Sequence, residues 1–157
     1  MEQPRHHRER LRFEDISYDS FPDGSTRVRV RLEWEGTLHI GEAHGSGTLE
    51  GDLRASAEAT LKAASTATVR RVRLTLIGIK AVRAFDARVI IAAVDARIEE
   101  LQYKLIGAHA VTEGDLPRAA VLTILDAVNR VVGPLVVSGE HPSDEAGAAV
   151  GGEAGEA

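Results

Sequence analysis

Glycine, histidine and aspartate recur in two segments of the 157-residue chain, in an order that could bind a small polar ligand. One segment runs from Gly41 to Asp52 and the other from Gly107 to Asp115. Each puts a glycine-containing loop before a predicted helix, where free backbone N–H groups and the helix dipole attract polar groups. The residues expected to contact a ligand are Gly41, His44, Gly45, Gly47, Asp52, Gly107, His109, Gly114 and Asp115.

The glycine-rich loop from Gly45 to Gly51 does not have the spacing of a phosphate-binding or dinucleotide-binding loop. Glu50 and Asp52 also put negative charge where a phosphate would lie. Two interpretations remain open. The loop is either a plain strand-to-helix turn, which we favour, or a site that holds a small ligand through its amine.

The two histidines His44 and His109 occupy nearly equivalent positions in the two segments. Together with Glu42, Glu113 or Asp115 they could form a symmetric zinc or proton-transfer site. The chain has no His-x-x-His or His-Glu-x-x-His spacing, however, so we favour ordinary strand-end histidines and predict no metal and no cofactor. Because cysteine and a Gly-x-Ser-x-Gly motif are also absent, we expect no enzymatic activity.

An arginine stripe, formed by Arg27, Arg29 and Arg31, follows one face of a predicted strand. Sheet surfaces that bind RNA combine such charge with stacking aromatic rings. Only 4% of the residues here are aromatic, and Glu33 and Glu35 continue the stripe. A solvated face, or ion pairs with a partner chain, is therefore favoured over nucleic-acid binding.

The net charge of −5 comes from the C-terminal end of the chain. Residues 138–157 hold five carboxylates and no lysine or arginine, and glycine and alanine dominate there. We predict a flexible basic N-terminus over residues 1–10, a folded domain over 11–137 and a disordered acidic tail over 138–157. No run of about 18 apolar residues and no secretory signal is present, so we expect no membrane association and a cytoplasmic protein.

The hydrophobic pattern occurs twice along the chain. Strands are predicted at residues 11–18, 26–35 and 37–43, followed by a helix from an Asp52 cap to about residue 64. The order repeats with strands at 71–82, 86–96 and 98–109, and a helix from an Asp115 cap that stops at Gly133-Pro134. The predicted fold is α+β, a tandem βββα-βββα repeat of antiparallel sheets with helices on one face.

The second copy contains a strand segment, Val89 to Val94, that is apolar on both faces. Helices cover one face of such a strand, so the other needs a second cover. A closed or folded-over sheet would supply it within one chain. We favour a homodimer that packs through this face.

Short motifs carry a family resemblance. The second helix contains Ala119-Ala120 and ends in Ala127-Val128-Asn129-Arg130, and Gly45-Ser46-Gly47 precedes the first helix. In these motifs and in its tandem topology, the chain over residues 11–132 resembles the C-terminal regulatory domain of 2-isopropylmalate synthase and citramalate synthase. It departs from that family at Thr48-Leu49-Glu50, where the family has Pro-Val-Asp-Ala.

The resemblance implies a stand-alone, non-catalytic, homodimeric regulatory domain that senses a small-molecule effector through its glycine loops. The alternative is a structural or adaptor protein that uses the same scaffold for self-association and for docking a protein partner, without a ligand.

Overall fold

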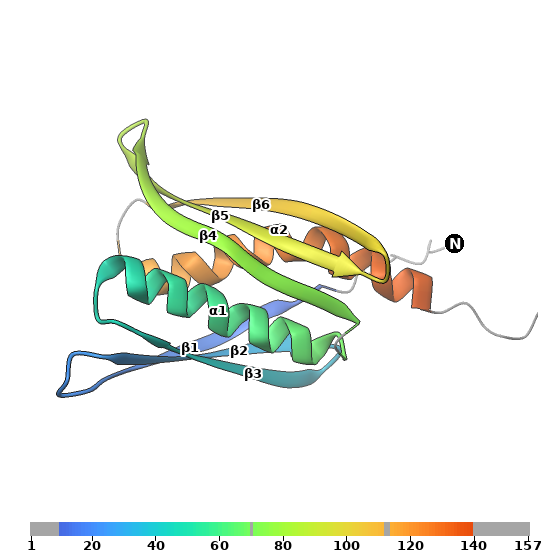
Figure 1. The fold of residues 1–157 in the computed structure, drawn as a ribbon, viewed down its shortest axis with the longest axis horizontal. Coiled ribbons are helices and arrows are strands. Elements are labelled where there is room, and N and C mark those ends of the chain that lie inside the picture. The colour runs from blue at the N-terminus through green and yellow to red at the C-terminus, as the bar shows by residue number, and fades with distance from the viewer. Residues whose placement is uncertain (1–9, 70, 112–113, 140–157) are drawn as a thin grey trace, which may run out of the picture.

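A computed structural model describes residues 10–69, 71–111 and 114–139 (Figure 1). Most of the two predicted flexible tails, residues 1–9 and 140–157, lies outside these ranges. The elements follow the order β1 (Arg12–Ser20), β2 (Thr26–Trp34), β3 (Thr37–Gly45), α1 (Leu49–Ala67), β4 (Val72–Ala84), β5 (Ala87–Ile98), β6 (Leu101–Val111) and α2 (Leu116–Gly139).

The strands form two separate antiparallel sheets. Sheet A has the order β1-β2-β3 and sheet B the order β4-β5-β6. The two helices lie in a layer between the sheets, side by side (Figure 1). Helix α1 packs on β2 and β3 and touches β4, whereas α2 packs on β5 and β6 and touches β1. The predicted α+β class and βββα-βββα order are confirmed.

The core lies between each sheet and the helix layer. The alternation in β2 predicts its inward side chains correctly, and Val28, Val30, Leu32 and Trp34 are all buried. Helix α1 is buried over more of its circumference than one stripe, because it contacts both sheets and α2. Its buried residues are mostly alanine, and short side chains let it approach all three neighbours.

Two predicted helix boundaries are wrong. Helix α1 is capped by Thr48, which has an extended backbone and whose Oγ1 accepts the N–H of Gly51 at 3.1 Å, so Asp52 lies inside the first turn. Helix α2 runs through Gly133 and Pro134 to Gly139. Proline removes one backbone hydrogen bond and can bend a helix without ending it. The Asp115 cap is confirmed, since its Oδ1 accepts the N–H of Arg118 at 3.2 Å.

Thr48→Ala should lower the free energy of unfolding by about 1 kcal/mol, because the Gly51 N–H then loses its acceptor at the helix start. Urea denaturation measures this. Thr66→Ala, near the exposed end of the same helix, is the matched control and should change stability by less than about 0.5 kcal/mol. Equal effects of the two changes would contradict the Thr48 cap.

Candidate functional site

The fold brings the starts of both helices to one end of the molecule (Figure 1). Leu53 of α1 packs there in a buried cluster with Ile90 of β5 and with Ala119 and Ala120 of α2. The two predicted ligand-binding segments therefore approach the same end of the helix layer, although they lie more than 60 positions apart in the chain.

Gly41 and Gly107 are packing positions beneath the helices. A Cβ on Gly41 would lie 1.9 Å from the backbone oxygen of Ala59, and one on Gly107 would lie 2.2 Å from that of Thr123. Both glycines are buried, and they let each helix rest directly on its sheet. The repeat that the sequence displays at these positions thus records helix–sheet contact.

Asp52 and the loop glycines hold α1 to sheet A. The Asp52 carboxylate accepts the hydroxyl of Thr26 at 2.7 Å and that of Tyr18, and this bond to Asp52 is the main cause that raises the pKa of Tyr18. Gly45 lies against the Thr26–Asp52 pair, where a Cβ would come within 2.5 Å of the Thr26 hydroxyl. Gly47 has φ +79° and packs on the turn between β1 and β2. These contacts fix the loop in place.

The two histidines do not come together. His44 lies on the outer face of sheet A, exposed, with Nε2 4.0 Å from the Glu42 carboxylate. Arg29 is the main cause that lowers the pKa of this glutamate. His109 lies on β6, an edge strand of sheet B, in register with Ile90.

No cluster of three or more His, Cys, Asp or Glu side chains fit to hold a metal exists among the described residues. The symmetric metal or proton-transfer site is therefore not formed there. Glu113 lies outside the described ranges. Gly114 is exposed with φ +107°, and a Cβ there would meet nothing within 4 Å. Asp115 serves as the helix cap.

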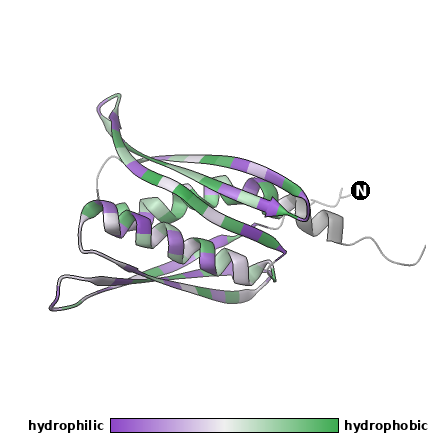
Figure 2. Cartoon of the chain, in the orientation of Figure 1, coloured by the Kyte–Doolittle hydropathy of each residue, from purple (hydrophilic) through white to green (hydrophobic). Residues whose placement is uncertain are grey.

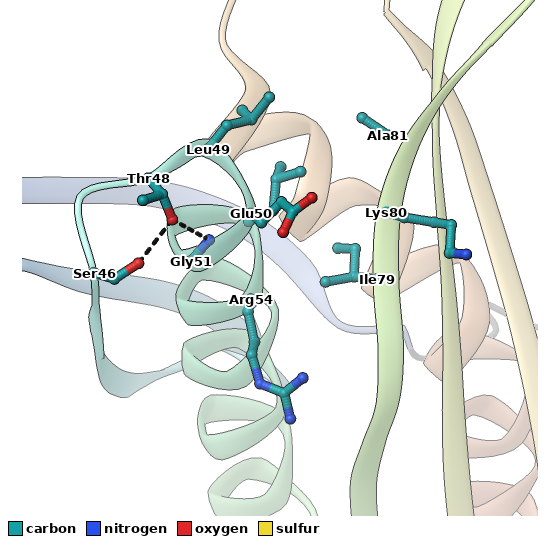
Figure 3. A pocket seen from close by; sticks show the side chains of 10 residues that line it. Ser46, Thr48, Leu49, Glu50, Gly51, Arg54, Ile79, Lys80 and Ala81 are labelled. Carbon is teal, nitrogen blue, oxygen red and sulfur yellow. Dashed lines mark hydrogen bonds between the residues drawn. The ribbon is translucent and has the colours of Figure 1, made fainter.

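A cleft of 560 Å³ opens where the first turn of α1 faces strand β4 (Figure 3). Its lining residues are Ser46, Thr48, Leu49, Glu50, Gly51, Leu53, Arg54, Ile79, Lys80 and Ala81. The volume falls within the range of about 300–1,000 Å³ that small-molecule sites occupy. One wall comes from the predicted glycine loop. The opposite wall, from β4, was missed because no local pattern in the sequence marks it.

The polar groups of the cleft are unequally satisfied. The hydroxyls of Ser46 and Thr48 lie 2.8 Å apart, and Thr48 also accepts the Gly51 N–H. Arg54 is engaged with Glu58 at 3.3 Å.

Glu50 has no hydrogen bond or ion pair with any residue in the described part of the chain, and its carboxylate points toward β4 (Figure 3). Ile79 points toward α1, whereas the Lys80 side chain points away from it (Figure 3). The cleft thus combines one carboxylate with the apolar side chains of Leu53, Ile79 and Ala81.

The arginine stripe is neutralised within the chain. Arg27 pairs with Asp19 at 3.0 Å, Arg29 with Glu42 at 3.0 Å and Arg31 with Asp15 at 3.1 Å. All three pairs join neighbouring strands on the outer face of sheet A. The ion-pair partners of the stripe come from the same chain. Phosphate would have to compete with these carboxylates for each guanidinium.

Comparison with known proteins gave no relative: no family model and no curated protein sequence matches the chain. Within the described residues, no helix is both long and apolar enough to cross a membrane.

Proposed function

We propose that the protein is a non-catalytic, homodimeric regulatory module that binds a small molecule carrying an amine and an apolar group. The cleft beside α1 carries this proposal, because it sets the unpaired Glu50 carboxylate opposite apolar side chains of β4. A protonated amine would pair with Glu50, and an aliphatic group would cover Ile79 and Leu53. The resemblance to the regulatory domain of isopropylmalate synthase supports a sensing role.

Strand β4 offers such a sensor a route to an output. Ile79 and Ala81 line the cleft, while the Lys80 side chain between them points away from α1 (Figure 3). The same three residues therefore contribute to the cleft and to the outer face of sheet B. A ligand that shifts β4 would change the shape of that outer face, and the two sites would be thermodynamically linked.

A ligand panel tests the proposal. Thermal unfolding of the protein should be followed with aliphatic amines, amino acids, 2-oxo acids and nucleotides. An amine-bearing ligand at about 100 times its dissociation constant should stabilise the fold by about 2.7 kcal/mol, which corresponds to several degrees in Tm.

The variant Glu50→Gln should abolish this stabilisation, because it removes the charge that the amine pairs with. Glu14→Gln, on exposed strand β1 and without an ion pair among the described residues, is the matched control and should keep the response. A flat panel, or a response that survives Glu50→Gln unchanged, would reject the cleft as the site.

The second candidate is a scaffold that self-associates and docks a protein partner without a ligand. The observation that favours it is the large apolar outer face of sheet B. This candidate predicts that the protein is a dimer and that no compound of the ligand panel changes its Tm.

A further inference from the structure

Strands β4, β5 and β6 contain hydrophobic stretches (Figure 2). An apolar region covers part of the outer face of sheet B, which points away from the helices. Along β5, the residues of this outer face alternate with Ile90, Ala92 and Val94, which point the other way and are buried against the helix layer. We call the following set the sheet B apolar face: Ile77, Val82, Val89, Ile91, Ala93, Ile106, Ala108 and Ala110. Ile77 is 49% exposed and Ile106 is 47% exposed, so these branched side chains face water in the single chain.

The charged groups of this sheet lie around the apolar face. Lys80 and Lys104 belong to the edge strands β4 and β6, from which long side chains can reach the rim. On the central strand β5, the outward residues are apolar as far as Ala93, and Asp95 and Arg97 follow toward the β5–β6 turn. Asp95 is already satisfied by the side-chain amide of Gln102 at 2.8 Å. Lys80 is in register with Ile91 on this outer face, so a partner covers the apolar face without burying that charge only if the long Lys80 side chain extends past the β4 edge into water.

The outer face of sheet A has the opposite character. Its three cross-strand ion pairs join Arg27, Arg29 and Arg31 to carboxylates of the same sheet. Packing sheet B of one copy on sheet A of another would remove these charges from water, which costs free energy that apolar contacts do not return. Packing sheet B on sheet B buries apolar groups against each other. This comparison favours the same face of a second copy as the occupant, which gives a closed dimer.

The size of the face is adequate for such a dimer. Sheet B has three strands of 11 to 13 residues. With a rise of about 3.3 Å per residue and a strand spacing of about 4.8 Å, the whole outer face of sheet B, which is the apolar face together with the charged residues around it, measures about 500 Å² per copy. A pair would bury about 1,000 Å², the size from which specific interfaces begin. Two sheets packed face to face would also keep their apolar side chains at the spacing of a protein core.

We propose that two copies pack face to face through the sheet B apolar face, related by a two-fold axis that lies in the interface. This inference rests on the proposed self-association, and it does not depend on the ligand. An in-plane two-fold axis through the centre of the face brings the central strand β5 close to its counterpart. Ala93, which lies near the middle of β5 and points outward, then faces Ala93 of the second copy.

The first test measures mass by size-exclusion chromatography with light scattering, over a range of concentrations. The full chain should have the mass of two chains, and Ile106→Glu the mass of one, because a carboxylate would be buried in the apolar contact. Ile40→Glu is the matched control on the outer face of sheet A, where Ile40 is 55% exposed, and it should remain a dimer. Circular dichroism confirms that each variant is folded.

A full chain with the mass of one chain at every concentration would overturn the inference, whether or not another protein covers the face. Dissociation of Ile40→Glu to the same extent as Ile106→Glu would overturn it too. Loss of the ligand response with an intact dimer would reject only the proposed sensing function. A ligand response from a chain that stays monomeric would reject only this dimer.

The second test uses the absence of cysteine from the chain. Ala93→Cys should be joined to its counterpart by a short bis-maleimide reagent, visible as a doubled band on a denaturing gel, because facing sheets lie about 10 Å apart, too far for a direct disulfide but within reach of such a spacer. Ser17→Cys is an exposed and nearly isosteric change on sheet A, and it should give much less cross-linked dimer. Equal cross-linking of the two variants would contradict the proposed face, as would no cross-link from Ala93→Cys.

Discussion

Gly41→Ala and Gly107→Ala should each lower the free energy of unfolding by about 3 kcal/mol or more, or prevent folding. The added Cβ would overlap the backbone of the helix above it, at 1.9 Å from the Ala59 oxygen or 2.2 Å from the Thr123 oxygen. A backbone atom in a packed helix cannot rotate aside as a side chain can, so the whole helix must move. Such a loss is a large part of the 5–15 kcal/mol that stabilises typical domains.

Gly78→Ala is the matched control for these two variants. Gly78 lies on β4, and a Cβ there would have nothing within 4 Å and no positive φ to strain it. Its stability should therefore change by less than about 1 kcal/mol. Urea denaturation of the three purified variants makes the comparison. If Gly41→Ala unfolds at the same urea concentration as Gly78→Ala, the contact between α1 and sheet A has room for a methyl group at Gly41, which contradicts the close packing.

Ile124→Ala should lower the free energy of unfolding by about 2–5 kcal/mol. Ile124 is fully buried in α2 and belongs to the main hydrophobic cluster. The two helices can be aligned by the residues that lie over the glycines, which are Ala59 of α1 over Gly41 and Thr123 of α2 over Gly107. In this alignment, Ile124 of α2 is equivalent to Thr60 of α1. The buried side chains of α1 are mostly alanine, whereas α2 supplies more of the buried branched side chains. Shortening a buried side chain of α2 to alanine therefore leaves a larger cavity than a substitution in α1 would.

The control for this variant is Ile40→Ala, which removes the same atoms from a side chain that is 55% exposed. It should change the stability by less than about 0.5 kcal/mol. Equal losses for the two variants would show that α2 does not carry the core contacts assigned to it. Calorimetry and urea denaturation should agree if the unfolding is two-state.

The sequence predicted the elements of this fold because their patterns are local. The strict alternation from Val28 to Trp34 specifies a strand with one buried face, and this is independent of what covers that face. The recurrence of the same order of elements then gives the repeat. The cap of α1 shows the limit of such patterns. Thr48 and Asp52 are both good caps four residues apart, and Thr26 decides between them by binding the Asp52 carboxylate.

The candidate site depended on the tertiary structure. Gly41 and Gly107 stand out in the sequence, but only the helices above them show that they serve packing. The cleft needs β4, whose Ile79 is nearly 30 positions from the loop that it faces. Both cases have one physical reason. Periodicity and capping depend on neighbours in the chain, whereas a contact between a helix and a distant strand depends on how whole elements pack, and no short segment encodes that.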